Sequence, residues 1–253
     1  MTQARTGSQA IERALAILNA FTAADPDLGI SELAHRVGLS TSTAHRMVRA
    51  LVAGGMLEQG VHSDRYRLGH RAVVTGQIAA HNLGMTEVAS LLNTLANTVG
   101  DSVSLGFLQG REVVVAFRAE ANDPLTFDRR PGAREFAHAS AMGKVLLAYS
   151  PHPAQLVDQL GDMVAFTPTT ITDPAALIAE LAAVRSCGFA TNNQERRAGA
   201  SGVSVPVFDH DRRVQAALVA HGPSDHFGAE RQDALLIELR ASAQQIGSAL
   251  SVA

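Results

Sequence analysis

The chain has 253 residues, of which 46% are hydrophobic and 18% are charged, and its formal net charge is −3. Its length exceeds that of a typical single domain and fits two domains with separate cores. No segment approaches the ~20 uninterrupted apolar residues of a membrane span. The N-terminal residues lack the apolar core of a signal peptide, so we expect a cytoplasmic protein. The single cysteine, Cys187, excludes an internal disulfide and a cysteine-rich zinc site, and we expect no metal and no cofactor.

The charge is distributed unevenly along the chain. Residues 1–82 contain eight arginines against six acidic residues, a balance of +2, whereas the remaining residues contain thirteen basic against eighteen acidic residues, a balance of −5. This asymmetry has the sign expected for a nucleic-acid-binding N-terminal part joined to an acidic body.

The first predicted element is a helix from Ser8 to Phe21. Ser8 is a suitable N-cap. The apolar residues expected on the buried face of this helix are Ile11, Leu15, Ile17, Leu18 and Phe21. The segment AADPDLG follows, and its Asp, Pro and Gly residues are expected to break the helical pattern.

Two short amphipathic helices are predicted within residues 30–51, on either side of a turn that contains Gly38. Gly38 can adopt the left-handed backbone conformation of such a turn at low cost. Ala34 is small enough for the second helix to cross closely above the first. We expect Ser31 to be the N-cap of the first helix.

The second helix of this pair presents a polar face. We expect Ser40 or Thr41 to cap it and Gly54 to end it. Its outer face carries side chains that can hydrogen-bond to phosphates or base edges, and none of them is acidic: Ser40, Thr41, Ser42, Thr43, His45, Arg46 and Arg49. The pattern fits a DNA-binding helix-turn-helix, and it also fits an ordinary helical hairpin with a polar outer face.

A β-hairpin is predicted directly after these helices. Residues 56–59 and 65–69 form two short strands joined by the polar turn GVHSD. A hairpin in this place makes a winged helix and favours DNA binding. We expect Arg46 to contact a base, because its planar guanidinium can bind guanine O6 and N7 together. We expect the other polar residues of the helix, and His62 and Arg65 of the wing, to contact phosphates or the minor groove.

The rest of the chain alternates between hairpins and helices. Residues 102–120 and 203–222 are each expected to form two strands around a short turn. Helical periodicity covers residues 70–82, 87–99, 174–186 and 229–252. Hairpins without βαβ crossovers indicate an α+β fold, with an antiparallel sheet flanked by helices.

Several separated motifs resemble the IclR family of bacterial transcription regulators. They are LSTSTAHRMVRAL, RYRLG, FAHASAMGKVLLAYSP, the segment 169–209 and AALVAHGPSDHF, and together they span about residues 8–250. The resemblance implies a winged helix-turn-helix domain over residues 1–69, a linker helix over residues 70–82 and a GAF-like effector-binding domain over residues 83–253. It also implies a regulator, such as a repressor, that is not an enzyme. Such a regulator forms a homodimer or a homotetramer, binds a palindromic double-stranded operator and responds to a small-molecule effector.

The resemblance further implies where the effector binds. Carried over residue by residue, the family pocket corresponds to Ala141, Met142, Asn192, Ala200, Gly202, Val219 and His221, with Leu125, Phe127 and Phe136 as its apolar wall. Relatives that bind small oxo-acids often carry an acid in the place of Asn192 and hydroxyl side chains in the places of Val219 and His221. Loss of a carboxylate removes repulsion toward an anion, and a histidine can donate to one. We therefore expect a carboxylate ligand larger or more aromatic than a two- or three-carbon acid.

The helix predicted after Ser140 is a second polar feature of this region. Its free backbone N–H groups lie at the positive end of the helix dipole, where a carboxylate can bind. Lys144 is expected either to bind the ligand or to hold a carbonyl or a nearby acid. Glu195 is expected to be a structural hydrogen-bond partner near the pocket.

Two other functions fit parts of the sequence. One is a small-molecule enzyme fused to a DNA-binding head. The motifs G-x-S-x-G and H-E-x-x-H and a pair of catalytic carboxylates are missing from the sequence, however, and His138 is expected to orient a loop. The other is an architectural DNA-binding protein without a ligand, which the acidic balance of the C-terminal part disfavours.

Overall fold

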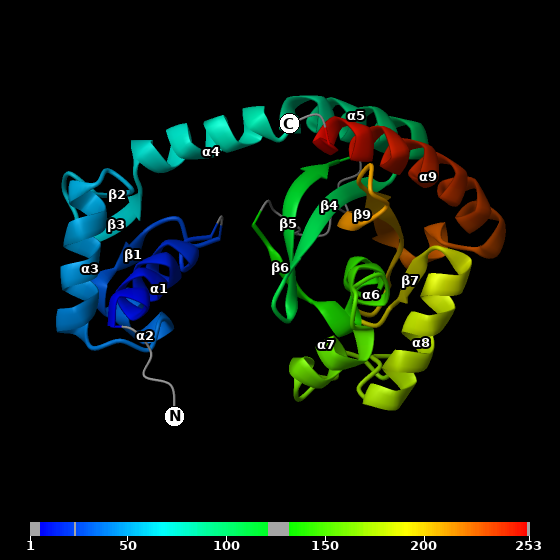
Figure 1. Ribbon diagram of the computed structural model, residues 1–253, viewed down its shortest axis with the longest axis horizontal. Helices are drawn as coiled ribbons and strands as arrows, with labels where there is room; N and C mark the ends of the chain where they lie inside the picture. Colours follow the sequence, from blue (N-terminus) through cyan, green and yellow to red (C-terminus); the bar gives the residue numbers. More distant parts are fainter. Residues whose placement is uncertain (1–5, 23, 121–131, 252–253) are drawn as a thin grey trace. The chain divides into compact units, whose positions relative to one another are not determined.

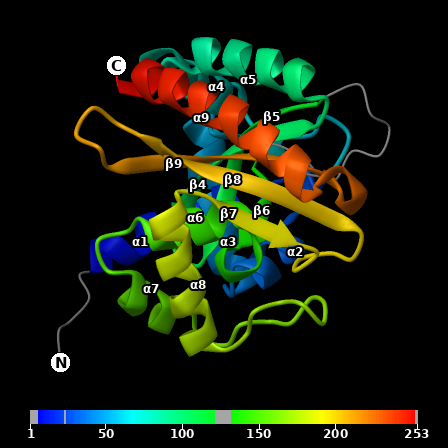
Figure 2. The same ribbon diagram turned by 90° about the vertical axis from the view of Figure 1, so that its right-hand side faces the viewer.

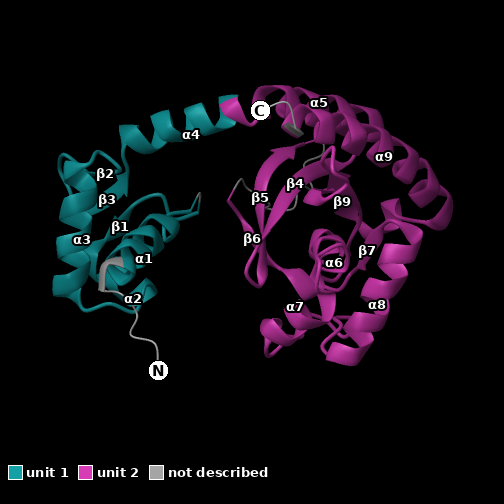
Figure 3. Ribbon diagram, viewed as in Figure 1, with its two compact units in different colours: residues 1–81 teal, residues 82–253 magenta. Residues whose placement is uncertain are grey.

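The computed structural model describes residues 6–22, 24–120 and 132–251 (Figure 1). Its internal contacts divide the chain into two compact units, Met1–His81 and Asn82–Ala253 (Figure 3). The first unit contains α1 (Thr6–Asn19), β1 (Leu28–Gly29), α2 (Ile30–Arg36), α3 (Thr41–Ala53), β2 (Leu57–Gln59), β3 (Arg65–Leu68) and most of α4 (His70–Asn82).

A small apolar core holds the first unit together. It consists of Ile17, Phe21, Leu28, Leu33, Val48, Leu57 and Tyr66. Because these residues come from the three helices and the adjoining strands, one buried cluster fixes the helices against the wing. The helix-turn-helix agrees with the sequence pattern: α3 ends at Ala53, and Gly38 has a φ of +65° in the turn.

The predicted wing is part of a three-stranded antiparallel sheet. The strand order is β1-β3-β2, with Leu28 opposite Tyr66 and Leu57 opposite Leu68. β1 lies in the segment AADPDLG, which was expected to be a break between helices. A strand of two residues has no alternation that the sequence could reveal.

The expectations for the first helix were wrong at two points. α1 begins at Thr6, and the Ser8 hydroxyl lies inside the helix, where it donates to Glu12 Oε1 (2.6 Å) instead of capping it. Ile11 and Leu15 are not buried but 64% and 53% exposed, because the core of the unit reaches only the residues from Ile17 onward.

The start of α2 also differs from the expectation. Its N-cap is Gly29 rather than Ser31, because β1 runs directly into the helix. The Gly29 N–H donates to Glu32 Oε2 (2.8 Å). This hydrogen bond, and to a smaller degree the charge of Arg65, lower the pKa of Glu32. The carboxylate therefore stays ionised in the first turn, where the helix dipole favours a negative charge.

The second unit is an antiparallel sheet with helices on both faces. Its six strands have the order β6-β5-β4-β9-β8-β7. The elements are α5 (Met85–Val99), β4 (Ser102–Gln109), β5 (Glu112–Ala119), β6 (Arg134–Phe136), η1 (Ala137–Ala139), α6 (Ala141–Ala148), α7 (Pro153–Leu160), α8 (Pro174–Cys187), β7 (Ala190–Asn193), β8 (Ala200–Phe208), β9 (Val214–Pro223), η2 (Ser224–His226) and α9 (Ala229–Ser251). Helices α5 and α9 lie side by side over one face, and α6, α7 and α8 cover the other (Figure 2).

The long elements of this unit agree with the sequence. β4 pairs with β5 and β8 with β9 as predicted, and α5, α8 and α9 cover three of the segments with helical periodicity. The α+β fold with an antiparallel sheet flanked by helices is confirmed. The sequence missed β6, β7 and α7, because elements of three, four and eight residues contain too few periods.

An apolar core lies between the sheet and α6. Met142 and Val145 of the helix are buried against strand residues that include Val219. Gly143 allows the start of α6 to approach η1 closely, since a Cβ at this position would collide with the backbone of Ala137. The close packing fixes the start of α6 against the sheet.

Candidate functional site

The N-terminal half of α3 forms a polar surface on the first unit. Ala44 and Val48 are buried beneath it. The residues predicted to contact DNA lie on the outer side of the helix, where Ser40, Thr41, Ser42, His45, Arg46 and Arg49 are exposed and Thr43 is half-buried. Within the described residues, neither Arg46 nor Arg49 has an ion-pair partner. Both guanidinium groups are therefore available to phosphates or base edges.

Three hydroxyl groups meet at the start of α3. Ser40 is the N-cap, and its Oγ accepts the Thr43 N–H (3.3 Å). The same Oγ lies 3.2 Å from Ser42 Oγ and 2.9 Å from Thr43 Oγ1. Hydroxyl donors at the positive end of a helix dipole are suited to bind a phosphate group.

The two predicted wing residues differ in their surroundings. His62 is exposed at the turn between β2 and β3. Arg65 faces the body of the unit, where its Nη2 donates to Asp27 O and to Glu32 Oε2, both at 2.8 Å. This pair ties β3 to the start of α2 and fixes the wing, while the Arg65 side chain remains 48% exposed.

A cavity of about 310 Å³ lies in the second unit. It is lined by Ala133, Arg134, Glu135, Phe166, Asn192, Arg196, Arg197, Ala200, Ser201 and His221. It thus brings together three of the predicted pocket residues, Asn192, Ala200 and His221. Three arginines against one glutamate in the lining favour an anion.

Of the three residues predicted to form the apolar wall, the structure describes only Phe136. Leu125 and Phe127 lie outside the described residues. Phe136 packs against Phe166 of the cavity lining, with the ring centroids 5.4 Å apart. Phe136 is therefore adjacent to the cavity without lining it.

The other predicted pocket residues support the cavity from the sheet and α6. Ala141, Met142 and Val219 belong to the core between α6 and the sheet. Gly202 lies opposite His221 in the β8–β9 register, and a Cβ there would lie 3.2 Å from His221 Cβ. A larger residue at this position would therefore crowd the backbone of Ala220 and the Cβ that carries the imidazole of His221.

Asn192 is held in place by hydrogen bonds on both sides of its amide. Its Nδ2 donates to Ala139 O (2.8 Å), and its Oδ1 accepts the Glu195 N–H (3.0 Å). The side chain joins η1 to the loop after β7. Its polar atoms consequently position the loop that carries Arg196 and Arg197.

Lys144 is a structural cation. Its side chain is 1% exposed, and its Nζ donates to Glu180 Oε1 (2.9 Å) and Glu195 Oε1 (2.8 Å). Of the two roles expected for this lysine, the structure shows that it holds nearby acids. The expected carboxylate site at the start of α6 is enclosed by the core, where Ser140 Oγ accepts the Gly143 N–H (3.0 Å).

His138 belongs to an aromatic cluster beside the cavity. Its ring is stacked on that of Phe166 at a centroid distance of 6.1 Å, and Phe136 lies 5.9 Å away. Burial lowers the pKa of His138, so the ring is neutral at neutral pH. Its Nε2 donates to Val164 O (3.0 Å), which orients the loop between α7 and α8.

The sequence did not identify Arg196 and Phe166 as pocket residues. Arg196 Cζ lies 5.3 Å from the centroid of the Phe166 ring, and both residues line the cavity. In the sequence Glu195-Arg196-Arg197 has the appearance of solvated surface charge. Two adjacent arginines directly after Glu195, which was expected to lie near the pocket as a structural partner, were the signal that could have identified Arg196.

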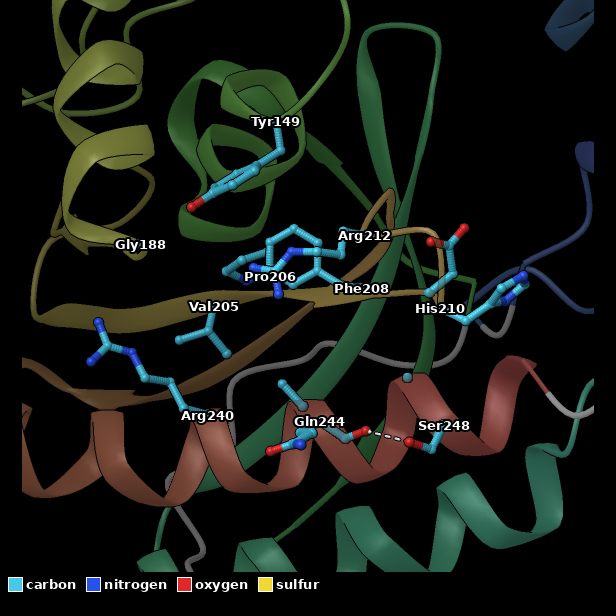
Figure 4. A pocket seen from close by; sticks show the side chains of 13 residues that line it. Tyr149, Gly188, Val205, Pro206, Phe208, His210, Arg212, Arg240, Gln244 and Ser248 are labelled. Atoms are coloured by element: carbon cyan, nitrogen blue, oxygen red, sulfur yellow. Dashed lines mark hydrogen bonds between the residues drawn. The ribbon is translucent and has the colours of Figure 1, made fainter.

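A second cavity, of about 560 Å³, lies between the end of β8 and α9 (Figure 4). Tyr149 and Phe208 contribute aromatic rings to it, with centroids 5.4 Å apart. Arg212 lies over Phe208, and Arg240 Nη2 donates to Cys187 O (3.0 Å). None of the predicted pocket residues that the structure describes lines this cavity, so the two cavities are distinct.

Neither a metal centre nor a membrane span is found in residues 6–22, 24–120 and 132–251. These residues contain no group of three or more His, Cys, Asp or Glu side chains that could hold a metal ion. No helix among them is long and apolar enough to cross a membrane.

Two family models match the chain. The model of the IclR helix-turn-helix domain matches residues 10–60. The model of the bacterial transcriptional regulator IclR C-terminal domain matches residues 77–248. The first match spans the helices α1 to α3 and β2, and the second spans the end of α4 and most of the unit that contains the cavities.

Relatives and solved structures match over nearly the whole chain. The chain is 34% identical over 246 residues to the HTH-type transcriptional regulator XynR of Escherichia coli, covering 96% of each protein. It is 33% identical over 232 residues to the HTH-type transcriptional regulator BhcR of Paracoccus denitrificans, covering 90% of this chain and 82% of that protein. An IclR homologue from Microbacterium hydrocarbonoxydans, complexed with 4-hydroxybenzoate, has a TM-score of 0.81 at 27% identity, covering 96% of this chain and all of the other (100%).

Proposed function

Because the chain belongs to the IclR family of bacterial transcriptional regulators, we propose that it binds a palindromic double-stranded operator and that a small carboxylate effector controls this binding. It is a regulator with a helix-turn-helix and not an enzyme. The observation that carries the proposal is the exposed face of α3, where Arg46 and Arg49 have no ion-pair partner among the described residues.

The proposed DNA contacts follow from the geometry of α3 and the wing. The N-terminal half of α3 enters the major groove, where Arg46 binds a guanine through two hydrogen bonds. The residues that contact phosphates and set the register are Ser40, Thr41, Ser42, Thr43, His45 and Arg49. At the wing, His62 contacts the DNA backbone or the minor groove. Arg65 does so as well, through the guanidinium nitrogens other than the Nη2 that binds Glu32.

The proposed effector is a carboxylate with an aromatic or similarly bulky body. The cavity of about 310 Å³ is close to the lower end of the ~300–1,000 Å³ range of small-molecule sites. Its arginines favour an anion, and Phe166, which packs against Phe136 behind it, supplies aromatic surface to the cavity. The relative from Microbacterium hydrocarbonoxydans binds 4-hydroxybenzoate, which is an acid of this class.

We propose a homodimer or a dimer of dimers. α1 exposes Ile11 and Leu15, and α4 exposes Val73, Val74 and Ile78, each to more than two-fifths of its surface. Apolar helix faces of this kind are typical of surfaces that a second subunit covers. Two heads joined in this way present two α3 helices to successive major grooves, about 34 Å or a multiple of it apart. Such a regulator acts in the cytoplasm, and it represses where its operator overlaps a promoter.

The signal is proposed to pass through α4, which connects the helix-turn-helix to the effector-binding part. The described residues of α4 include no buried side chain, so little packing opposes a change in its position. An effector that binds one arrangement of the heads better than the other shifts the population between them.

A band-shift titration of the full chain with DNA upstream of its own gene and of the neighbouring genes tests the proposal. One fragment is expected to bind about 10³-fold or more tightly than random DNA. Addition of 4-hydroxybenzoate is expected to move the midpoint for that fragment alone. Equal affinity for all fragments with one steep salt dependence would indicate a general DNA-binding protein instead.

A further inference from the structure

The guanidinium group of Arg196 lacks an acceptor for one of its buried donors. Within the described residues, Arg196 Nη1 is buried and has no hydrogen-bond partner. Arg196 Cζ lies over the ring of Phe166, 5.3 Å from the centroid. Arginine remains charged in proteins, so an unpaired and partly desolvated guanidinium group opposes folding.

Other polar side chains at the same cavity do have partners. Arg134 Nη1 donates to Glu112 Oε2 (3.1 Å), and the amide of Asn192 is hydrogen-bonded on both sides. The nearby Lys144 is held by Glu180 and Glu195. Arg134, Asn192 and Lys144 thus have structural partners. Arg196 lines the same cavity as Arg134 and Asn192 but has no such structural role.

The backbone next to Arg196 is fixed by hydrogen bonds from two directions. The Glu195 N–H donates to Asn192 Oδ1 (3.0 Å), and Thr170 Oγ1 donates to Glu195 O (2.5 Å). A cation–π contact with the ring of Phe166 also holds the guanidinium group beside the cavity. The Arg196 side chain is therefore already placed at the cavity before any ligand arrives, which lowers the entropic cost of binding.

We propose that Arg196 binds the carboxylate group of the effector and that Phe166 is its positioning residue. The proposal rests on the proposed function, because it takes the cavity of about 310 Å³ as the effector site. A guanidinium group can donate two parallel hydrogen bonds to a carboxylate, and no other charged side chain matches that geometry. Arg196 thus selects acids over neutral molecules of the same shape.

Calorimetric titration of the full chain with 4-hydroxybenzoate and with the neutral 4-hydroxybenzamide tests this role. Arg196→Leu is expected to lower the affinity for the acid about 10- to 100-fold, and to change that for the amide less than about twofold. Arg196→Lys keeps the charge without the planar fork and is expected to give an intermediate loss. Arg134→Leu removes the same charge from a paired position of the cavity, and Arg240→Leu removes it from the second cavity.

Each result of this titration has a definite meaning. Equal losses of affinity for the acid in Arg134→Leu and Arg196→Leu would show that only the net charge of the cavity matters, and would overturn the proposal. A loss of affinity confined to Arg240→Leu would show that the acid binds in the second cavity, and would overturn it too. Unchanged affinity in Arg196→Leu would overturn it while leaving regulation by a carboxylate intact. A wild-type protein that binds neither 4-hydroxybenzoate, benzoate nor glyoxylate would overturn the proposed effector class and, with it, the role of Arg196.

Thermal unfolding of Arg196→Leu separates a binding role from a structural one. Loss of an unpaired charge is expected to leave the melting temperature unchanged or to raise it. A melting temperature several degrees below that of the wild-type protein would show that Arg196 stabilises the fold, and would overturn the proposal.

Discussion

The polar residues of α3 and those around the cavity of about 310 Å³ are arranged in opposite ways. Arg46 and Arg49 on α3 are exposed, and no described residue forms an ion pair with them. Lys144 in the second unit is 1% exposed and held by two acids. An exposed cation is solvated by water and needs no partner within the protein, whereas a buried cation must be paired within the fold. The two arginines of α3 are thus available to a partner, whereas Lys144 in the second unit maintains structure, with Arg196 as the proposed exception.

Lys144→Met gives the largest effect that this contrast predicts. The substitution leaves Glu195, whose side chain is 7% exposed, without its buried cation. We expect the free energy of unfolding of the second unit to fall by about 3–5 kcal/mol. Urea unfolding followed by far-ultraviolet circular dichroism measures the change.

Glu180→Gln is the matched control for Lys144→Met. The Glu180 side chain is 32% exposed, so solvent weakens its ion pair with Lys144, and the buried pair between Lys144 and Glu195 remains in the variant. The substitution should therefore cost no more than about 1 kcal/mol. If Lys144→Met is equally mild, the buried pair of Lys144 and Glu195 does not stabilise the fold, and the contrast between the two regions fails.

Arg46→Ala is expected to weaken operator binding by about 1–3 kcal/mol and to relax the preference for one base pair. Because the side chain is exposed, the free energy of unfolding should change by less than about 0.5 kcal/mol. Fluorescence anisotropy with operator variants measures the affinity. The comparison variant Arg49→Ala should weaken binding to all operator variants alike. It should also reduce the slope of log affinity against log salt concentration by about 1. Unchanged binding by Arg46→Ala would mean that α3 does not read bases.

The same contrast explains which parts of the molecule could be predicted from its sequence. The face of α3 is local, because its register follows from a helix of 13 residues with buried Ala44 and Val48. The polar network of the second unit is not local. Lys144 meets Glu195 across 51 positions of sequence, and no periodicity indicates such a pairing.

Short elements and exposed apolar faces account for two further differences from the sequence predictions. β1 has two residues and could not be distinguished from a turn. Ile11 and Leu15 follow the helical period of a buried face, yet both are exposed in the first unit. A sequence pattern indicates that one face of a helix is apolar. It does not indicate whether residues of the same chain or of a second subunit cover that face.

Ser40→Ala tests a residue that caps a helix and is also proposed to contact DNA. Ser40 Oγ caps α3 through the Thr43 N–H, so its loss should lower the free energy of unfolding by about 1 kcal/mol. Operator affinity should fall as well, since a phosphate donor disappears. Ser42→Ala is the control, because Ser42 Oγ lies within hydrogen-bond distance of Ser40 Oγ and caps no backbone group. A stability loss as large in Ser42→Ala would show that the hydroxyl cluster, and not the cap, stabilises the helix.

The titration of His138 is expected to have the smallest effect on the free energy of unfolding. It tests whether a buried histidine beside the cavity depends on pH in a way that an exposed one does not. Burial lowers the pKa of this ring in the folded protein below its value of about 6.5 in the unfolded chain, so the unfolded state takes up the proton first. The stability associated with the neutral ring is therefore complete above about pH 6.5 and is lost as the pH falls through the lowered pKa. Urea unfolding of the wild-type protein and of His138→Gln between about pH 7.5 and 5 measures this loss, which only the wild-type protein should show. If the two proteins lose stability in parallel, the ring of His138 is not the titrating group, and a buried histidine beside the cavity costs the fold no more than an exposed one.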